Sequence, residues 1–430
     1  MTDTQRNLGG PALASLLVSA HYGLGFLLGT GEGALAGGLA GSLYAVSIAV
    51  GTLILLGLAR FYWQKIEQLW TILGDRYGQS VRALVAVIAW ASLIGAEAVQ
   101  IISGVSILSI FGWPTLPTAL GLMAAFAGLS LLPIARLSWL LRALLVFNVA
   151  VLLFALVALQ GTDIYVRAPL QVWPALVRVA PGEAIGVSIT TIALVLVDMK
   201  YQQYLVRARD LRSLYWGCTL AACLLFALAL LPAALTIAAG RAEILPAGID
   251  GKAVVPYILA WLGGGPDRAL GVVLVASLIV PALGVGSGVL RLQTKAISDF
   301  KLLPDTAVTR GIFATGNGLL GLAVALKGGS LIGTMVCFYA AYAAVVWVPF
   351  GAYLWRGDRT SATSVRNALL CGGVGAIGVL VMLLFFPQWA PFERAEIGVA
   401  VAGSGLGLLG LLGTQAWESY ILPRRGLSSN

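Results

Sequence analysis

The stretch LVLVDMKYQQYLVRARDL, residues 194–211, starts as an apolar run and then carries Asp198 and Lys200 before its basic flank. If Arg207 marks the edge of an apolar environment, nine residues of helix place Asp198 about 13 Å inside it. A carboxylate at that depth is costly, so it should face protein groups or a water-filled cavity, and it is a candidate functional residue. The alternative is an ion pair with Lys200 or a hydrogen bond between packed helices.

The composition of the whole chain indicates that lipid surrounds most of it. The 430 residues are 59% hydrophobic and only 10% charged, whereas soluble domains carry about 25% charged residues. The apolar run from Leu8 is too long for a cleavable signal sequence, so we expect it to remain as the first helix. The net charge of +9 comes from basic residues scattered between apolar segments, which indicates membrane topology and no nucleic-acid partner. The cysteines lack the spacing of a zinc site or a disulfide framework.

Twelve segments are long and apolar enough to be predicted as membrane-spanning helices. An amino terminus in the cytoplasm puts most of the 27 basic residues on the inner side, as the positive-inside rule requires. We therefore predict a multi-pass protein of the cell membrane, either a plasma membrane or a bacterial inner membrane, with both termini in the cytoplasm. The predicted segments are 9–38, 40–60, 81–111, 114–134, 138–159, 182–206, 213–239, 269–297, 308–326, 329–355, 367–386 and 395–422.

Further polar residues lie inside these apolar segments. His21 is the only histidine; imidazole titrates near neutral pH and suits proton transfer, but a satisfied core histidine is the alternative. Glu97 and Gln100 are spaced i,i+3 and share a helix face, so Gln100 could simply satisfy Glu97. Arg291 lies at a similar depth in the eighth segment. We expect Glu32, on the outer half of the first segment, to line an outer vestibule.

Several motifs together resemble the sodium/solute symporter family, which includes sodium-coupled sugar and proline carriers. The opening stretch, with Asp198, Gln203 and Asp210, is similar to the sixth core helix of that family and the loop that follows it. The stretches RYGQSVRALVAVIAWASLIGAEAVQIISG, residues 76–104, and GLGFLLGTGEGALAGGLAG, residues 23–41, are similar to its third and first core helices.

The resemblance implies an all-α membrane fold. Two inverted five-helix repeats, residues 1–160 and 161–360, would be followed by two further helices in 361–430, giving twelve transmembrane helices. In this fold the first and sixth helices are broken near the midplane, here at SAHYGLG, residues 19–25, and just before Asp198. Broken helices expose backbone groups that bind ions and polar solutes.

The resemblance also implies two sets of site residues. His21 and Asp198 would border a solute cavity next to the breaks. The residues that we expect to bind the solute are His21, Gly25, Glu97, Gln100, Val197 and Asp198. Those that we expect to take part in ion coupling are Ser19, Tyr22, Ser287, Arg291 and Asp198.

The eighth segment departs from the family at the expected sodium site. Asp299 matches the acidic residue that ends the family's eighth helix, and counting back from it places Leu283 and Gly284 where sodium-coupled members have two hydroxyl ligands. Leucine supplies no oxygen for a hard cation. A shifted match offers only Ser287. The coupling ion is therefore left open between Na⁺ and H⁺.

A resident cation could replace the missing sodium. Helical side chains lean toward the amino terminus, so the guanidinium of Arg291 could reach back into the vacant position. Protonation of Asp198, Glu97 or His21 would then supply any coupling. The alternative for Arg291 is snorkelling to the inner interface.

These patterns predict a secondary transporter that moves a small polar solute by alternating access, without a cofactor. Because Glu32, Glu97 and Asp198 outnumber the basic residues at that depth, a cationic or zwitterionic solute is favoured. A membrane-embedded solute sensor that acts through a partner, and a carrier of divalent metal ions, are the alternatives. The single histidine and the lack of HExxH and GxSxG motifs argue against an enzyme. The expected partners are the solute and the lipid bilayer, and association into a homo-oligomer is left open.

Overall fold

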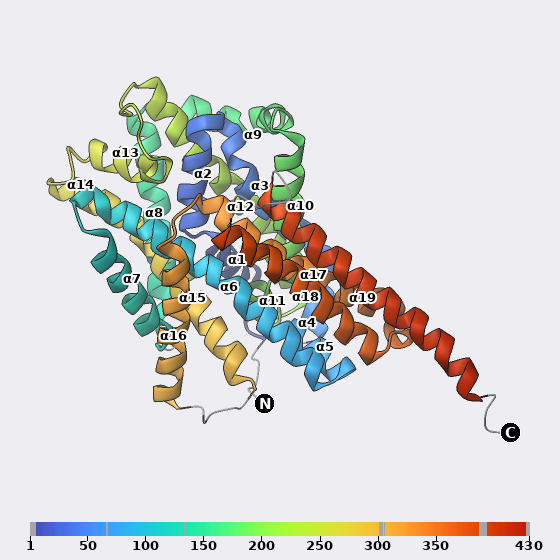
Figure 1. Cartoon of the computed structure of the whole chain (residues 1–430). Helices are drawn as coiled ribbons and strands as arrows, with labels where there is room; N and C mark the ends of the chain where they lie inside the picture. The colour runs from blue at the N-terminus through green and yellow to red at the C-terminus, as the bar shows by residue number, and fades with distance from the viewer. Residues whose placement is uncertain are drawn as a thin grey trace.

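The computed structural model describes residues 6–65, 68–132, 134–300, 304, 306–386 and 394–426. These residues form helices and connecting loops, with one isolated backbone bridge between Leu8 and Ala208 (Figure 1). The described α-helices are α1 Gly10–His21, α2 Leu24–Gly37, α3 Leu43–Ile54, α4 Leu56–Lys65, α5 Leu69–Tyr77, α6 Gln79–Leu108, α7 Thr115–Ser130, α8 Ile134–Ala158, α9 Thr162–Val177, α10 Pro181–Val197, α11 Met199–Leu205, α12 Leu211–Arg241, α13 Val254–Leu262, α14 Ala269–Ala276, α15 Ile279–Ser298, α16 Ala307–Ala325, α17 Leu331–Arg356, α18 Ala362–Phe385 and α19 Ala395–Gly426.

Many of these helices are long and apolar enough to cross a membrane. Within the described residues, eight helices or nearly continuous helical runs meet this standard. A ninth is added if α8 and α9, which meet at 106°, count as one span. The prediction of an all-α protein with several membrane-spanning helices is thus confirmed, and the described residues contain eight or nine candidate spans; the finer prediction of twelve spans stays a prediction. Helix α7, for example, is apolar but only 16 residues long.

The first break separates α1 from α2. Gly23 lies in the gap, where an added Cβ would be only 2.9 Å from a methyl group of Val285 on α15. The absence of a side chain at Gly23 therefore allows the break between α1 and α2 to lie this close to α15. The backbone N–H of Leu24, at the start of α2, donates a 3.1 Å hydrogen bond to Oε1 of Gln100. The break falls inside the predicted range, residues 19–25.

The second break consists of Asp198 alone, between α10 and α11. Its backbone is extended, with φ −67° and ψ 118°. Its carboxylate accepts a 2.7 Å hydrogen bond from the backbone N–H of Lys200 and thereby caps the amino terminus of α11. An aspartate in an apolar run thus starts a new helix, because its side chain satisfies a backbone donor that the interrupted helix leaves free.

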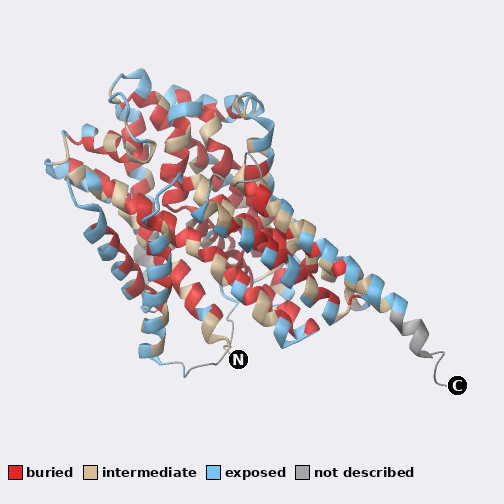
Figure 2. Cartoon of the chain, in the orientation of Figure 1, coloured by how far each residue is buried: buried red, intermediate tan, exposed pale blue. Residues whose placement is uncertain are grey.

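Helix α6 packs against α15, α16 and α17. Helix α12 packs against α1 and α3. Buried residues gather where these helices meet, and exposed residues lie on the outer faces (Figure 2). Many of the exposed side chains are large and apolar, such as Leu170 and Trp173 on α9, as expected of surfaces that face lipid or its interface.

The last two described helices, α18 and α19, pack along each other and against α17. Glycines make the approach close: a Cβ on Gly375 would lie 2.8 Å from the carbonyl oxygen of Ala402, and one on Gly410 would lie 2.8 Å from that of Asn367. Small residues allow such backbone approach in membrane helices. These two helices therefore pack closely against each other and, mainly through α17, against the rest of the helices.

Candidate functional site

The break at Asp198 gathers ionisable side chains. Asp198 Oδ2 lies 3.3 Å from Lys200 Nζ and 3.0 Å from His21 Nε2. The contact with His21 has the length of an ion pair, but the two atoms are not aligned for a hydrogen bond. The Asp198 side chain is 2% exposed and that of Lys200 7%. The buried negative charge of Asp198 is therefore balanced by the ammonium of Lys200. This is the ion pair that the sequence offered as an alternative to a functional role.

The His21 ring completes this cluster. It packs edge-on against the ring of Tyr201, with 4.7 Å between the centroids. The hydroxyl of Tyr201 lies 2.9 Å from that of Thr52 on α3. The contact between His21 and Asp198 joins the carboxyl end of α1 to the amino end of α11, so the cluster holds the two broken spans together.

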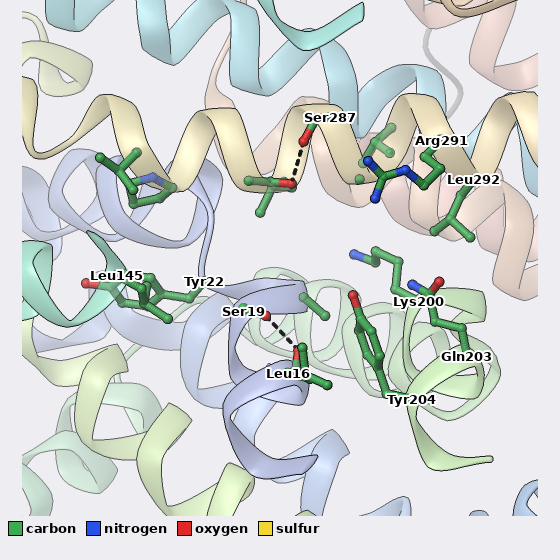
Figure 3. Close-up of a pocket in the computed structure, with 17 residues that line it drawn as sticks. Leu16, Ser19, Tyr22, Leu145, Lys200, Gln203, Tyr204, Ser287, Arg291 and Leu292 are labelled. Atoms are coloured by element: carbon green, nitrogen blue, oxygen red, sulfur yellow. Dashed lines mark hydrogen bonds between the residues drawn. The ribbon is translucent and has the colours of Figure 1, made fainter. Parts of the chain in front are cut away.

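A cavity of about 120 Å³ lies on the α1 and α11 side of the breaks. This exceeds several-fold the roughly 10–15 Å³ that one water needs. Helices α1, α8, α11 and α15 form its walls (Figure 3). Its polar lining consists of Ser19, Tyr22, Lys200, Gln203, Tyr204, Ser287 and Arg291, and its apolar lining includes Leu16, Ala20, Leu145, Pro281, Val285 and Leu292.

The predicted ion-coupling residues other than Asp198 line this cavity. Ser19 lines it from α1, Tyr22 from the break after α1, and Ser287 and Arg291 from α15. The hydroxyl of Ser19 donates to Leu16 O at 2.9 Å and that of Ser287 to Gly284 O at 3.3 Å. Both hydroxyl hydrogens therefore bond their own helices, which leaves the oxygen lone pairs for a ligand.

The predicted solute-binding residues, including His21 and Asp198, are not among the residues that line this cavity. The Asp198 carboxylate faces Lys200 and His21 instead, because burial requires that its charge be paired. The backbone oxygen of Val197 accepts hydrogen bonds from Gln202 Nε2 and the Tyr342 hydroxyl.

Gly25, Gln100 and Glu97 serve the packing of α2 and α6. A Cβ on Gly25 would lie 2.8 Å from Met335 Cε on α17. Gln100 accepts the hydrogen bond from Leu24 N and so completes the first break; it does not satisfy Glu97. Both Glu97 carboxylate oxygens are buried without a hydrogen-bond partner among the described residues, and the side chain lies against α16.

Arg291 does not reach back along α15 toward Gly284. Its Nε donates to Ser130 O at 3.0 Å, and its Nη2 donates to Leu129 O at 3.2 Å and Leu132 O at 2.9 Å. These carbonyls form the carboxyl end of α7, where helix dipoles favour a cation. The guanidinium therefore lines the cavity while it is fixed to α7, and Lys200 is the resident cation nearest the second break.

Glu32, which we expected to line an outer vestibule, is half-buried and bonded to the start of α17. Its carboxylate accepts a 3.1 Å hydrogen bond from the backbone N–H of Leu331 at the start of α17. A Cβ on Gly251, at the start of the short helix Gly251–Ala253, would lie 2.9 Å from Glu32 Cγ. Glu32 thus ties α2 to two segments at the end of the molecule that lies opposite the cavity.

A row of cavity-lining residues on α11 was not predicted from the sequence. Lys200, Gln203 and Tyr204 are spaced i, i+3 and i+4 and so lie on one face of the helix, and all three line the cavity. Figure 3 shows their side chains directed toward α15 and Arg291. Their spacing within an otherwise apolar span was the available signal. Among the described residues, no group of three His, Cys, Asp or Glu side chains could hold a metal ion.

No protein-family model and no curated protein sequence matches the chain. Several solved structures do match. A Na⁺-coupled sialic acid symporter in a substrate-bound outward-open state aligns with a TM-score of 0.67 and 14% identity, over 94% of this chain and 90% of that one. A nucleobase-cation-symport-1 family transporter, in a closed conformation with bromovinylhydantoin bound, aligns with a TM-score of 0.53 and 15% identity, over 97% of this chain and 94% of that one. A manganese transporter mutant from Eremococcus coleocola aligns with a TM-score of 0.50 and 15% identity, over 96% of this chain and 95% of that one.

These similarities cover nearly the whole of each chain. They confirm, at the level of the fold, the resemblance to sodium/solute symporters that the sequence motifs indicated. At 14–15% identity they establish the fold alone.

Proposed function

We propose that this protein is a secondary transporter that moves a small polar solute across the cell membrane by alternating access. The observation that carries this proposal is the placement of the cavity: it lies against two broken spans, α1–α2 and α10–α11, whose interrupted ends contact each other through His21 and Asp198. Broken helices at the centre of a membrane fold provide polar groups where lipid-facing helices provide none. The similarity of the fold to three transporters supports the same conclusion.

The proposal includes the architecture that the sequence indicated. Residues 1–160 and 161–360 form two inverted repeats, and residues 361–430 add two helices, for twelve spans in all. In support, each proposed repeat has a break in its first span, at Gly23 and at Asp198. Breaks in corresponding positions of two halves are characteristic of inverted-repeat transporters.

With both termini in the cytoplasm, α1 and α11 are the inner halves of their spans. The cavity then lies on the cytoplasmic side of the breaks. On the outer side, the hydrogen bond from Leu331 N to Glu32 connects α17 to α2. We infer that the structure represents an inward-facing state, and that outward opening separates α2 from the start of α17.

We further propose that transport does not require sodium. On α15 the cavity is lined by Gly284 and by a single hydroxyl residue, Ser287, whereas a hard cation needs several oxygen ligands. The ammonium of Lys200 and the guanidinium of Arg291 already line the same space. Replacing sodium by choline should leave the rate of solute uptake into proteoliposomes unchanged; strict sodium dependence would contradict this part of the proposal.

Alternating access can be tested without knowing the solute. In a background without the native cysteines, Ser287→Cys should react with a membrane-impermeant maleimide from either side of sealed vesicles. Ser109→Cys, at the outer end of α6, and Arg207→Cys, in the inner loop after α11, are exposed controls that should each react from one side only. Reaction of Ser287→Cys from a single side under all conditions would refute alternating access.

A further inference from the structure

The charged groups that line the cavity are all basic. Within the described residues, Lys200 and Arg291 line it and no aspartate or glutamate does. This differs from the sequence-based expectation of a cationic or zwitterionic solute, which rested on counting carboxylates at similar depth. Glu97 and Glu32 do not line the cavity, because Glu97 faces α16 and Glu32 bonds to α17.

The local charge does not sum to zero. Asp198 contributes one negative charge and Lys200 one positive charge, and their side chains are within 3.3 Å of each other. Arg291 contributes a second positive charge, and its hydrogen bonds go to backbone carbonyls and not to a carboxylate. The carboxyl end of α7 offsets only about half an elementary charge. The site therefore keeps a net positive charge in a region of low dielectric.

Two further donors are free to bind a ligand. The hydroxyl of Tyr204 and the amide of Gln203 have no hydrogen-bond partner among the residues that the structure describes. Both lie on the face of α11 that carries Lys200, opposite Arg291 (Figure 3). Ammonium, phenol, amide and guanidinium groups from two helices thus surround one small space, and the rest of its lining is mainly apolar.

We propose that this cavity binds a short-chain organic monocarboxylate, with its carboxylate between Lys200 and Tyr204 on α11 and Arg291 on α15, and its apolar end against Leu16 and Val285. The inference rests on the proposed transport function and names its substrate class. A carboxylate neutralises the excess charge and accepts hydrogen bonds from several donors at once. An organic cation would face two like charges without a carboxylate among the lining residues.

The test measures thermal stabilisation of the purified full-length protein, since a ligand of the folded state raises the melting temperature. The probes are three matched sets: acetate, acetamide and ethylamine; lactate, lactamide and 1-amino-2-propanol; butyrate, butyramide and butylamine. Chloride is used to keep the ionic strength equal. At least one carboxylate should give a saturable increase in melting temperature, and its amide and amine should give none.

Variants assign the effect to the cavity. Tyr204→Phe keeps the ring and removes one donor, so it should weaken the apparent affinity for the active carboxylate about tenfold. Tyr215→Phe, on α12 and outside the cavity, is the matched control and should bind normally. Lys200→Met combined with Asp198→Asn removes both members of the ion pair, so it leaves no unpaired charge, and it should abolish the stabilisation.

Several results would overturn the inference. They are an equal or larger effect of the amides or amines, no effect of any of the carboxylates, an equal effect of chloride alone, or normal carboxylate affinity in Tyr204→Phe and in the double variant. The maleimide reaction of Ser287→Cys tests transport separately. Reaction from both sides without carboxylate binding would refute the substrate class and leave the transporter proposal standing.

Discussion

Replacing Asp198 by asparagine should destabilise the protein strongly, because it leaves the ammonium of Lys200 buried without its carboxylate. Asparagine keeps a side-chain oxygen for the backbone N–H of Lys200, so the helix cap, worth about 1 kcal/mol, is largely retained. Breaking a buried pair by removing one member costs about 3–5 kcal/mol. Lys200 Nζ also lies 5.6 Å from the centroid of the Tyr339 ring, a cation–π contact that survives the substitution. We therefore expect a cost near the lower end, about 3 kcal/mol.

A double-mutant cycle separates the ion pair from other effects. Unfolding in mixed micelles, followed by titration with a denaturing detergent, gives relative free energies for the wild type, Asp198→Asn, Lys200→Met and the double variant. The double variant should be more stable than Asp198→Asn, because it leaves no unpaired buried charge. An Asp198→Asn protein as stable as the wild type, or additive effects in the double variant, would refute the ion pair as the reason for the buried charge.

Two further substitutions test the packing around the site. Gly321→Ala on α16 would place its Cβ 2.6 Å from Glu97 Cγ and should lower the free energy of unfolding by about 1–3 kcal/mol. The control Gly316→Ala, on the same helix, meets open space and should be neutral or stabilising by up to about 1 kcal/mol. Equal unfolding free energies of the two variants would contradict this. Tyr22→Phe removes the hydroxyl that donates at 3.0 Å to the fully buried Asn148 Oδ1 and should cost about 1–3 kcal/mol, which the same unfolding assay can detect; an unchanged unfolding free energy would show that the hydrogen bond contributes nothing.

The two helix breaks could be predicted from the resemblance to the symporter family, and the sequence also contains local features that favour them. Asp198 caps the helix that follows it with its own side chain, and Gly23 lies in a glycine-rich stretch that resembles a known broken helix. Long apolar segments likewise predicted the all-α membrane fold, since hydrophobicity over a whole span is a property of sequence alone. The number of spans was less secure, because α7 and α9 are short or sharply bent and depend on their neighbours for their position.

The partners of individual polar side chains could not be predicted in the same way. Direction along one helix suggested that Arg291 points toward Gly284, but the carboxyl end of α7 lies beside it and accepts its hydrogen bonds. Glu97 and Gln100 share a face of α6, yet one lies against α16 and the other bonds to the first break. In each case the deciding group comes from a distant part of the chain, and one helix's periodicity carries no information about it.

The position of the ion pair, and not its strength, explains why charges interrupt the apolar stretch at 194–211. A buried ion pair is often no more stabilising than apolar residues of similar size, so stability alone gives no reason for Asp198 and Lys200. Asp198 must be at the break to cap α11, and its negative charge allows Lys200 to be buried one helical turn from the free Gln203 and Tyr204 side chains. The aspartate thus allows an ammonium to be buried on the face of α11 that lines the cavity, where it faces the guanidinium of Arg291.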